Sequence, residues 1–522
     1  MEPTMEKRID ALFARWQQGV CPGGQVAIRH KGELIYDKCF GYANVENELP
    51  VTDQSVFHVA SVSKQLTVFA VLLLHEDGKL HVDDDIRKYV GDLVRFEQPV
   101  TIRNLFNNVS GIRDIWTLEM MRGVRIDDTI TMQDAVSIIA RQRALNFEPE
   151  NEYMYSNSNF VLLAVIVERV TGMTLNDFLK QRVFEPLGMD STCVRQTYWQ
   201  RIDHRAQSYH DNGSAILHAV LNFGTYGATS LHTTAKDYLK WMRNYHAPVL
   251  CKPETLKLML SVPALQSGNP TDYAGGLRVG ELGGHRYIQH SGVDAAFRAS
   301  MMHIFDEDLD IVIFANTQNT LPVTASFRIA RMLLGVQEPV LPDPPAYYTE
   351  AFDEADAAGY YYDDLPTCVG VDVFAHNGQL CMREWFDPAP LTHVKGNMYR
   401  VGHLGNYLYL GETAAYVVEG EVQLLHKADA SPKPAAHLAG FAGTYASEEL
   451  LTAYDVVYED GALYLSHFRG GKHRLYEMRR DTFIGGAPLT LVVQFTRGSG
   501  NEVIGLTFSA PRIQHLAFSK VR

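Results

Sequence analysis

The sequence predicts an α+β domain over residues 1–336, followed by two antiparallel β-barrel domains over residues 346–429 and 437–522. Three observations support this fold class. The first region mixes apolar residues at helical and at strand spacing, and the helical spacing ends with that region. Short alternating strands with Gly or Asn turns fill the rest of the chain, as is typical of antiparallel barrels. Two proline-rich linkers, at 339–345 and 430–435, separate the three parts.

The elements of the first region follow one another in a clear order. We expect an amphipathic helix, a β-hairpin around a turn at 30–33, a largely helical block over 61–260, three late strands and a final helix. The corresponding segments are 5–18; Gln25–Arg29 and Leu34–Phe40; Phe160–Val170 and Ala235–Asn244 within the block; Arg286–Gln289, Ala299–Phe305 and Ile311–Ala315; and 323–334. Because strands lie near both ends, we expect one antiparallel sheet built from the two ends, with helices packed around it.

The two β-rich parts resemble each other. The run 371–380 lines up with 454–463, and both contain a hairpin turn ending in Gly. Just upstream, Ala358-Gly359-Tyr360 corresponds to 442–445. The two barrels are therefore predicted to be copies of one duplicated domain.

Composition excludes several classes of function. The net charge is −14 and no run of Lys or Arg stands out, which argues against nucleic acid as a partner. No apolar stretch follows the first charged residues, and no apolar window is long enough for a membrane span. Motifs of the C-x-x-C or H-E-x-x-H type are absent, and the cysteines are scattered at 21, 39, 193, 251, 368 and 381. We therefore expect a cytoplasmic protein without a metal, a cofactor or a membrane partner.

Ser61 and Lys64 form the only Ser-x-x-Lys in the sequence. A helix places residues three apart side by side, so the lysine amine would lie next to the hydroxyl. A serine hydroxyl needs such a neighbour to act as a nucleophile. The apolar stripe that follows, Leu66, Phe69, Leu72 and Leu73, would bury the helix and fix the serine at its N-terminus. The alternative is a solvated surface pair.

Two further motifs follow this pair along the chain. Tyr155-Ser156-Asn157 precedes an apolar helix, and His290-Ser291-Gly292 follows a strand. Each motif occurs elsewhere as well, at Tyr42-Ala43-Asn44 and at 30–32, 376–378 and 403–405, in contexts typical of turns or barrels. Only the order of the three motifs is specific.

That order resembles the penicillin-recognising serine hydrolases, the superfamily of class C β-lactamases, DD-peptidases and related esterases. Three more stretches are similar to the family's pattern: 108–112, with Asn108 where the family has His; 147–149; and 184–189. The resemblance covers roughly residues 15–335. It implies a β-lactamase-like domain, with an antiparallel sheet flanked by helices and a helical subdomain.

The resemblance also implies roles for individual residues. Ser61 would attack an acyl carbonyl, with Lys64 and Tyr155 handling its proton; which of the two is the formal base stays open. The backbone N–H groups of Ser61 and Val293 would form the oxyanion hole. The expected substrate-binding residues are Asn157, His290, Gly292, Val293, Asp294 and Arg298. We expect Gly292 to leave room for the substrate, and His290 to attract a carboxylate less than the lysine of many β-lactamases. His290 could also be a structural residue at the end of its strand.

The three-domain plan is similar to that of D-stereospecific aminopeptidases, as are 60–65, 107–111 and Phe297-Arg298. In those enzymes a loop of the last domain supplies an acidic group for the substrate amine. The matching hairpin here, Arg469–Arg474, is basic and would suit an anion instead. Asp294 could replace the acidic group, or could be a solvated residue at a strand end.

These observations predict a serine hydrolase, a D-stereospecific aminopeptidase or amidase acting on small peptides or amides. An esterase or acyl transferase with the same residues is the alternative. A non-enzymatic peptide-binding protein is the third hypothesis. By resemblance alone the protein would be a homodimer.

Overall fold

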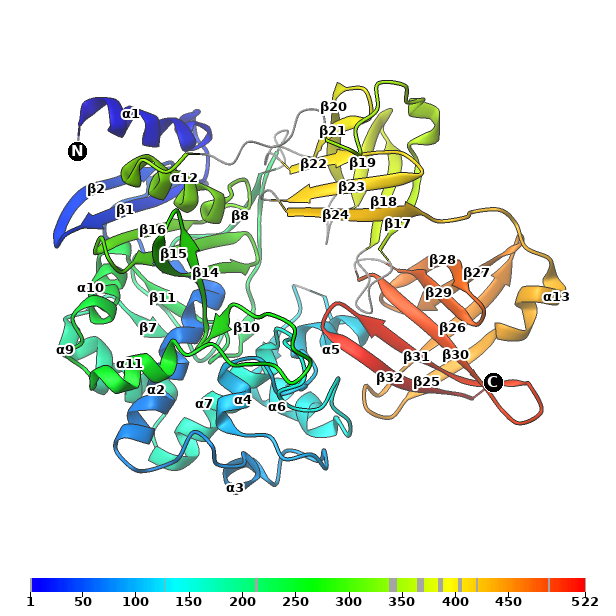
Figure 1. Cartoon of the computed structure of the whole chain (residues 1–522), viewed down its shortest axis with the longest axis horizontal. Helices are drawn as coiled ribbons and strands as arrows, with labels where there is room; N and C mark the ends of the chain where they lie inside the picture. Colours follow the sequence, from blue (N-terminus) through cyan, green and yellow to red (C-terminus); the bar gives the residue numbers. More distant parts are fainter. Residues whose placement is uncertain are drawn as a thin grey trace. The chain divides into compact units, whose positions relative to one another are not determined.

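The computed structural model describes residues 2–125, 127–211, 215–337, 345–363, 370–383, 388–401, 406–418, 421–486 and 489–521. The chain divides into two compact units (Figure 1). The first contains Met1–Ile112 and Ile126–Glu338, and the second contains Arg113–Arg125 and Pro339–Arg522. Most of the first predicted linker, 338–344, lies outside the described residues.

A seven-stranded antiparallel sheet forms the centre of the first unit, in the order β12-β13-β14-β15-β16-β1-β2. These strands are Tyr273–Ala274, Leu277–Leu282, His285–Asp294, Phe297–Ile304, Leu309–Ala315, Gly24–His30 and Glu33–Phe40. Strand β1 pairs with β16 along its whole length, from Gly24 opposite Ala315 to His30 opposite Leu309. The prediction of one sheet built from both ends of this region is confirmed.

Two helices from opposite ends of the unit pack on one face of this sheet, α1 (Pro3–Leu12) and α12 (Pro322–Leu334). Ile9, Ile28, Ile311 and Ile329 meet there in one buried core. Helix α10 (Ala235–His246) packs against β1 and β16, and its Tyr238 ring meets Phe314 edge-on at 5.6 Å. The sheet is thus covered by helices on both faces (Figure 1).

The helical block consists of short elements around two longer ones. The long helices are α2 (Lys64–Glu76) and α7 (Asn157–Thr171), which pack together. The other helices are α3 (Arg87–Val90), α4 (Ile102–Phe106), α6 (Met132–Arg141), α8 (Leu175–Leu179), α9 (Glu185–Leu187) and α11 (Pro253–Met259). Short strands connect them: β3 (Tyr42–Asn44), β4 (Leu49–Pro50), β5 (Phe57–His58), β6 (Ile130–Thr131), β7 (Cys193–Val194), β8 (Tyr209–Asp211), β9 (Ile216–His218), β10 (Phe223–Gly224) and β11 (Leu231–Thr233).

Most elements begin or end a few residues from the predicted bounds, and three of these differences bear on the core or the site. The helix expected over 5–18 is α1 followed by a 3₁₀ turn, Ala14–Gln17, because Phe13 leaves helical geometry so that Phe13 and Trp16 can both enter the core. The helix expected to begin at Ser61 begins as a 3₁₀ turn, Ala60–Ser63, before α2 starts at Lys64. Strand β14 continues to Asp294, five residues beyond the predicted end at Gln289.

The second unit contains two closed antiparallel barrels of eight strands each, which confirms the predicted barrel fold. The first comprises β17 (Gly359–Tyr362), β18 (Gly370–His376), β19 (Gln379–Arg383), β20 (Pro388–Lys395), β21 (Met398–Val401), β22 (Asn406–Tyr409), β23 (Thr413–Val418) and β24 (Glu421–Lys427). The second comprises β25 (Gly443–Ser447), β26 (Thr452–Glu459), β27 (Ala462–His467), β28 (Gly471–Arg479), β29 (Thr482–Gly485), β30 (Leu491–Arg497), β31 (Val503–Ala510) and β32 (Ile513–Lys520). A short helix, α13 (Ala435–Leu438), precedes the second barrel.

The aligned segments form the same hairpin in both barrels, β18–β19 and β26–β27. A buried tyrosine on the first strand of each barrel donates a hydrogen bond to a carbonyl four residues earlier. These bonds run from Tyr361 to Ala357 (2.8 Å) and from Tyr445 to Phe441 (2.6 Å). The residue equivalent to Tyr445 is therefore Tyr361 and not Tyr360.

The segment Arg113–Arg125, which contains α5 (Ile115–Met121), belongs to the second unit although it lies within the first region of the sequence. Arg113, only 2% exposed, forms an ion pair with Glu449 at 3.0 Å. The Tyr454 hydroxyl donates to the carbonyl of Met121 at 2.8 Å. Figure 1 shows α5 beside β31 and β32 of the second barrel. The sequence patterns did not predict this packing.

We find no single helix, among the described residues, with the length and apolar content that crossing a membrane requires. Helix α7 and the following stretch Leu175–Leu187 meet that test only as a pair bent by 76°.

Candidate active site

Ser61 lies in the 3₁₀ turn that precedes α2, and β11 holds this turn in place. The Val59 N–H donates to the Leu231 carbonyl at 3.1 Å. The Ser63 hydroxyl accepts from the Leu231 N–H at 3.0 Å and donates to the Ala60 carbonyl at 2.5 Å. Ala60 itself has φ +48°, a left-handed conformation that costs an alanine about 1–2 kcal/mol. The residue before Ser61 is therefore strained, as is common at functional sites.

Lys64 is fully buried and directs its ammonium group at three oxygens. Nζ donates to Ser61 Oγ at 3.0 Å, to Asn157 Oδ1 at 2.8 Å and to the Ala228 carbonyl at 2.7 Å. An ammonium group has three donors, and each has an acceptor here. The surface-pair alternative is wrong, because Lys64 joins the first residues of α2 and α7 at Ser61.

Tyr155 lies beside this lysine. Lys64 Nζ is 4.8 Å from the centre of the Tyr155 ring, and the His290 ring is 6.2 Å away. The Tyr273 ring meets Tyr155 edge-on at 5.9 Å. The three predicted motifs thus meet in space around Ser61.

Asn108 supports the Tyr155 segment, a role that sequence reasoning did not assign. Its Oδ1 accepts from the Ser156 N–H at 3.1 Å and from Asn159 Nδ2 at 2.8 Å, and its carbonyl accepts from the Met154 N–H at 3.0 Å. Asn108 has φ +57°, a conformation that Asn tolerates better than most residues. The Asn found where the family has His therefore fits both the backbone and the contacts.

The end of β14 lies against the turn that carries Ser61. Strand β13 pairs with β14 only as far as Gln289, so 290–294 has β15 on one side and, among the described residues, no strand on the other. A Cβ atom on Gly292 would lie 2.2 Å from the Val59 carbonyl oxygen. The close approach of the Val59 backbone is therefore one reason for a glycine here. The room that Gly292 would leave for substrate stays a prediction. Val293 follows, with its side chain 60% exposed.

His290 is buried, and both of its ring nitrogens have partners. Nδ1 donates to the Ser291 carbonyl at 2.6 Å, and Nε2 accepts from the Tyr273 hydroxyl at 3.1 Å. Burial, together with the charge of Lys64, lowers the pKa of His290 to about 3. The ring is therefore neutral at physiological pH and offers no positive charge to a substrate carboxylate.

Asp294 and Arg298 lie at the turn between β14 and β15. Asp294 Oδ2 is 2.9 Å from His58 Nε2 and accepts from the Thr229 hydroxyl at 2.9 Å. The alternative of a solvated residue at a strand end is therefore wrong. Arg298 donates to the carbonyls of Ala295 (3.2 Å) and Phe297 (2.9 Å), which braces the turn.

The basic hairpin Arg469–Arg474 belongs to the second unit and connects β27 to β28. The backbone N–H groups of Arg469 and Gly470 donate to His467 Nδ1, at 3.3 and 3.2 Å. Within this unit the hairpin packs on Gly123, where an added Cβ would lie 2.4 Å from the His467 ring.

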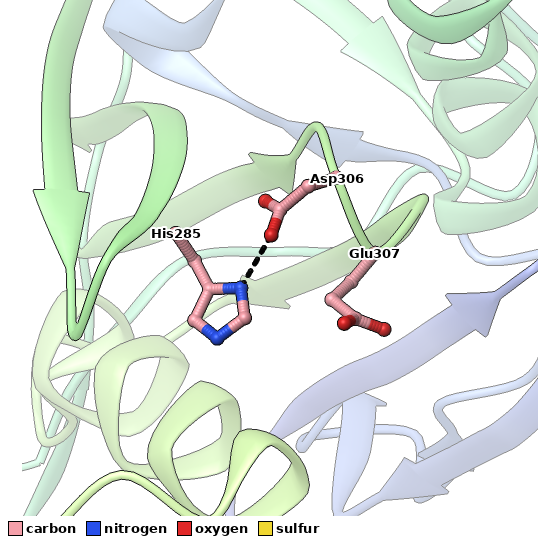
Figure 2. Close-up of side chains that lie close together, drawn as sticks. All are labelled: His285, Asp306 and Glu307. Atoms are coloured by element: carbon pink, nitrogen blue, oxygen red, sulfur yellow. Dashed lines mark hydrogen bonds and ion pairs between the residues drawn. The ribbon is translucent and has the colours of Figure 1, made fainter.

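Two groups of side chains at the turn between β15 and β16 have the composition of metal ligands. One contains His285, Asp306 and Glu307, and Figure 2 shows His285 pointing toward Asp306, with Nδ1 2.6 Å from Oδ2. The other contains His303, Asp308 and Asp310. Protein cations already pair with both groups: Lys31 with Glu307 at 3.1 Å, and Arg29 with Asp308 and Asp310.

Comparison with known proteins gives matches over most of the chain. Residues 8–334 match the family model described as Beta-lactamase. A D-aminopeptidase of Gluconobacter oxydans (strain 621H) is 27% identical, over 91% of this chain and 89% of its own length. A D-aminopeptidase of Brucella anthropi is 28% identical, over 93% of each chain. Among solved structures, the octameric penicillin-binding protein homologue from Pyrococcus abyssi superposes with a TM-score of 0.57 at 20% identity, covering 81% of this chain and 98% of that one.

Proposed function

The chain belongs to the beta-lactamase family, and from that premise we propose that it is a D-aminopeptidase or amidase that forms an acyl-enzyme on Ser61. The observation that carries this proposal is the contact of a fully buried lysine ammonium with Ser61 Oγ at 3.0 Å and Asn157 Oδ1 at 2.8 Å. The two D-aminopeptidase relatives match across both barrels as well, which supports this activity over others in the family.

The acylation step uses Ser61, Lys64 and Tyr155. Ser61 Oγ attacks the substrate carbonyl and forms a C–O bond, while its proton passes to the Lys64–Tyr155 pair. The pair then returns that proton to the leaving amine as the C–N bond breaks. In deacylation a water molecule attacks the ester, loses its proton to the same pair, and Ser61 leaves as the restored hydroxyl. Lys64 stabilises negative charge on the oxygen in both steps.

The oxyanion is stabilised by backbone donors in this mechanism. The N–H groups of Ser61 and Val293 are the pair we assign, because Gly292 allows β14 to approach the Val59–Ser61 backbone closely. One such donor is worth about 10²–10³ in rate. The Asn157 amide group, which Lys64 holds through its oxygen, would bind the acyl-side carbonyl of the substrate.

The neutral His290 favours a substrate without a carboxylate at this position. A lysine there would attract a carboxylate, whereas an imidazole with a pKa of about 3 does not. Small D-amino acid amides, and peptides whose carboxylate lies beyond this position, fit this preference, and so would neutral esters. By resemblance the assembly would be a homodimer, which sedimentation velocity tests.

The test compares D- and L-alanyl p-nitroanilide, a p-nitrophenyl ester and a cephalosporin, using the full chain. We expect turnover of the D-anilide above that of the L-anilide and of the cephalosporin, and complete loss in Ser61→Ala. Ser499→Ala, in an exposed turn, is the matched control and should keep wild-type rates. Preference for the L-anilide, or equal activity in Ser61→Ala, would contradict the proposal. Rapid ester turnover without any amide turnover would instead favour the esterase or acyl transferase alternative.

A further inference from the structure

We infer that His58, Thr229 and Asp294 form a hydrogen-bonded clamp that sets the distance between the Ser61 turn and the oxyanion strand β14. The inference rests on the proposed acyl-enzyme chemistry, but not on the identity of the substrate. It makes His58 and Asp294 positioning residues, which act through the backbone and do not touch the reacting atoms.

The clamp joins the three segments that make up the site. His58 ends β5, three residues before Ser61; Thr229 follows Ala228, whose carbonyl accepts from Lys64; and Asp294 ends β14, two residues after Gly292. Asp294 Oδ2 accepts hydrogen bonds from His58 Nε2 and from the Thr229 hydroxyl, both at 2.9 Å. The Thr229 hydroxyl lies 3.3 Å from His58 Nε2. One carboxylate oxygen therefore connects all three segments.

The contacts also determine which atoms donate in these hydrogen bonds. Oδ2 is an acceptor, so the Thr229 hydroxyl and His58 Nε2–H both donate to it. His58 is 1% exposed, and its Nδ1 is buried without a hydrogen-bond partner in the described part of the chain. A proton on Nδ1 would bury an unpaired N–H, so the His58 proton in this contact is the one on Nε2.

Other charged groups surround the clamp. The His232 ring lies 4.9 Å from His58, and burial, together with the nearby His58 and Arg205, holds the pKa of His232 well below its usual value. Burial and the charge of Arg205 lower the pKa of Arg195 to about 10, and the charge of Asp294 acts in the opposite direction. Asp294 is therefore the acidic group among these cations.

This arrangement explains why Asp294 is needed directly after Val293, whose N–H is the assigned oxyanion donor. Both of its hydrogen bonds use Oδ2, and the side chain is 12% exposed. If the clamp opens, β14 is free to shift away from the Ser61 turn, and a misplacement of about 1 Å is enough to cost about 10²-fold in rate. Because the second oxygen, Oδ1, takes no part in the clamp, binding of a substrate amine is the competing explanation for the presence of Asp294.

The experiment measures kcat and KM for D-alanyl p-nitroanilide and for p-nitrophenyl acetate, which has no amine. We expect Asp294→Asn and His58→Leu to lower kcat about 10- to 100-fold for both substrates, with KM changed less than about twofold. His58→Gln, whose amide N–H can replace Nε2–H, should recover much of the loss. Thr229→Val, the mildest change, should show a loss of about threefold to tenfold. Asp203→Asn, an exposed carboxylate in the same unit, is the control.

Three outcomes overturn the clamp. These are unchanged kcat in all clamp variants, loss confined to the anilide in Asp294→Asn, and failure of His58→Gln to exceed His58→Leu. Thermal melting and the stoichiometry of Ser61 labelling by a fluorophosphonate identify variants that do not fold, and Thr229→Val then decides the question. If the wild type hydrolyses only the ester, the aminopeptidase proposal fails, while the ester kinetics and the labelling rate still test the clamp.

Discussion

The two barrels of the second unit have the same strand order, yet they differ in the segments that pack against them. Both begin with a buried tyrosine that donates to the carbonyl four residues earlier, and both turn at the same hairpin. The second barrel also packs against Arg113–Arg125. At one aligned position the first barrel has Val371, which is buried, and the second has Tyr454, whose hydroxyl reaches the Met121 carbonyl.

This difference separates the features of the barrel fold from the features that hold an extra segment. The shared features belong to the first strand and the first hairpin of each barrel. Tyr454, Glu449 and the His467 hairpin serve the added segment instead. The segment begins at Arg113, three residues after Ser110. The Ser110 hydroxyl donates to Asn159 Oδ1 at 2.7 Å, and Asn159 in turn contacts Asn108, which supports the Tyr155 segment. Four predictions test the comparison of the two barrels.

The largest effect is expected at the buried ion pair. Glu449→Ala leaves the 2%-exposed Arg113 without its carboxylate, which costs about 3 kcal/mol in the free energy of unfolding. In the first barrel, Asp372→Ala removes a pair with Arg383 in which both side chains are more than a third exposed, so it should cost less than about 1 kcal/mol. Urea-dependent hydrogen exchange of peptides from α5, β18 and β31 measures both. Equal losses would show that α5 does not depend on this pair.

The hairpin turns supply the next comparison. Gly378 and Gly461 both have φ +77°. A Cβ at Gly378 meets nothing within 4 Å, but at Gly461 it would lie 2.7 Å from Pro432 Cβ. Gly378→Ala should therefore cost about 1–2 kcal/mol for the left-handed backbone alone, and Gly461→Ala about 1 kcal/mol more. Urea midpoints of the two variants decide this, and a greater loss in Gly378→Ala would contradict it.

The tyrosine hydrogen bonds test what the barrels share. Tyr361→Phe and Tyr445→Phe each remove one buried hydrogen bond and keep the ring, so each should cost about 1 kcal/mol. We expect equal losses in thermal unfolding experiments. A difference of more than about 1 kcal/mol between the variants would mean that the two tyrosines are not equivalent.

The smallest effect is a pH dependence at the second barrel. His467 Nδ1 accepts from two backbone N–H groups, and burial together with Arg469 lowers the pKa of His467 below its usual 6.5. The unfolded chain then binds the proton more readily, so stability is complete above about pH 6.5 and decreases as the pH falls below that value. The protection of amides in β27–β28, corrected for the intrinsic exchange rate at each pH, should decrease between pH 7.5 and 5.5. His467→Asn should remove this decrease, because Asn can accept the same bonds without titrating.

Local patterns were sufficient to predict many of the elements. Alternation identified β1, β2 and the barrel strands, because spacing of two to four residues directly reflects a strand or a helix. Helical spacing alone placed Lys64 beside Ser61. The place of Tyr155 beside Lys64 came instead from the resemblance to a known family, since the two residues lie far apart in the sequence.

Contacts between distant residues could not be predicted in the same way. Nothing near Asp294 in the sequence indicates that it binds His58, 236 residues away, or that Gly292 faces the Val59 carbonyl. The packing of α5 on the second barrel depends on Glu449 and Tyr454. Nothing in the sequence around these two residues distinguishes them from other residues of the barrel. Only the folded backbone brings such partners together.

The packing of α5 on the second barrel also determines how late in protein synthesis this part of the fold can form. Arg113 and Glu449 are 336 residues apart, and ribosomes add about 5–20 residues per second, so Arg113 waits on the order of tens of seconds for its partner. During that time Ile115 and Leu118, both fully buried in the finished protein, have no second barrel to pack against. The packing of α5 on its barrel is therefore one of the last steps of folding, because neither Glu449 nor Tyr454 exists until most of the chain has been made.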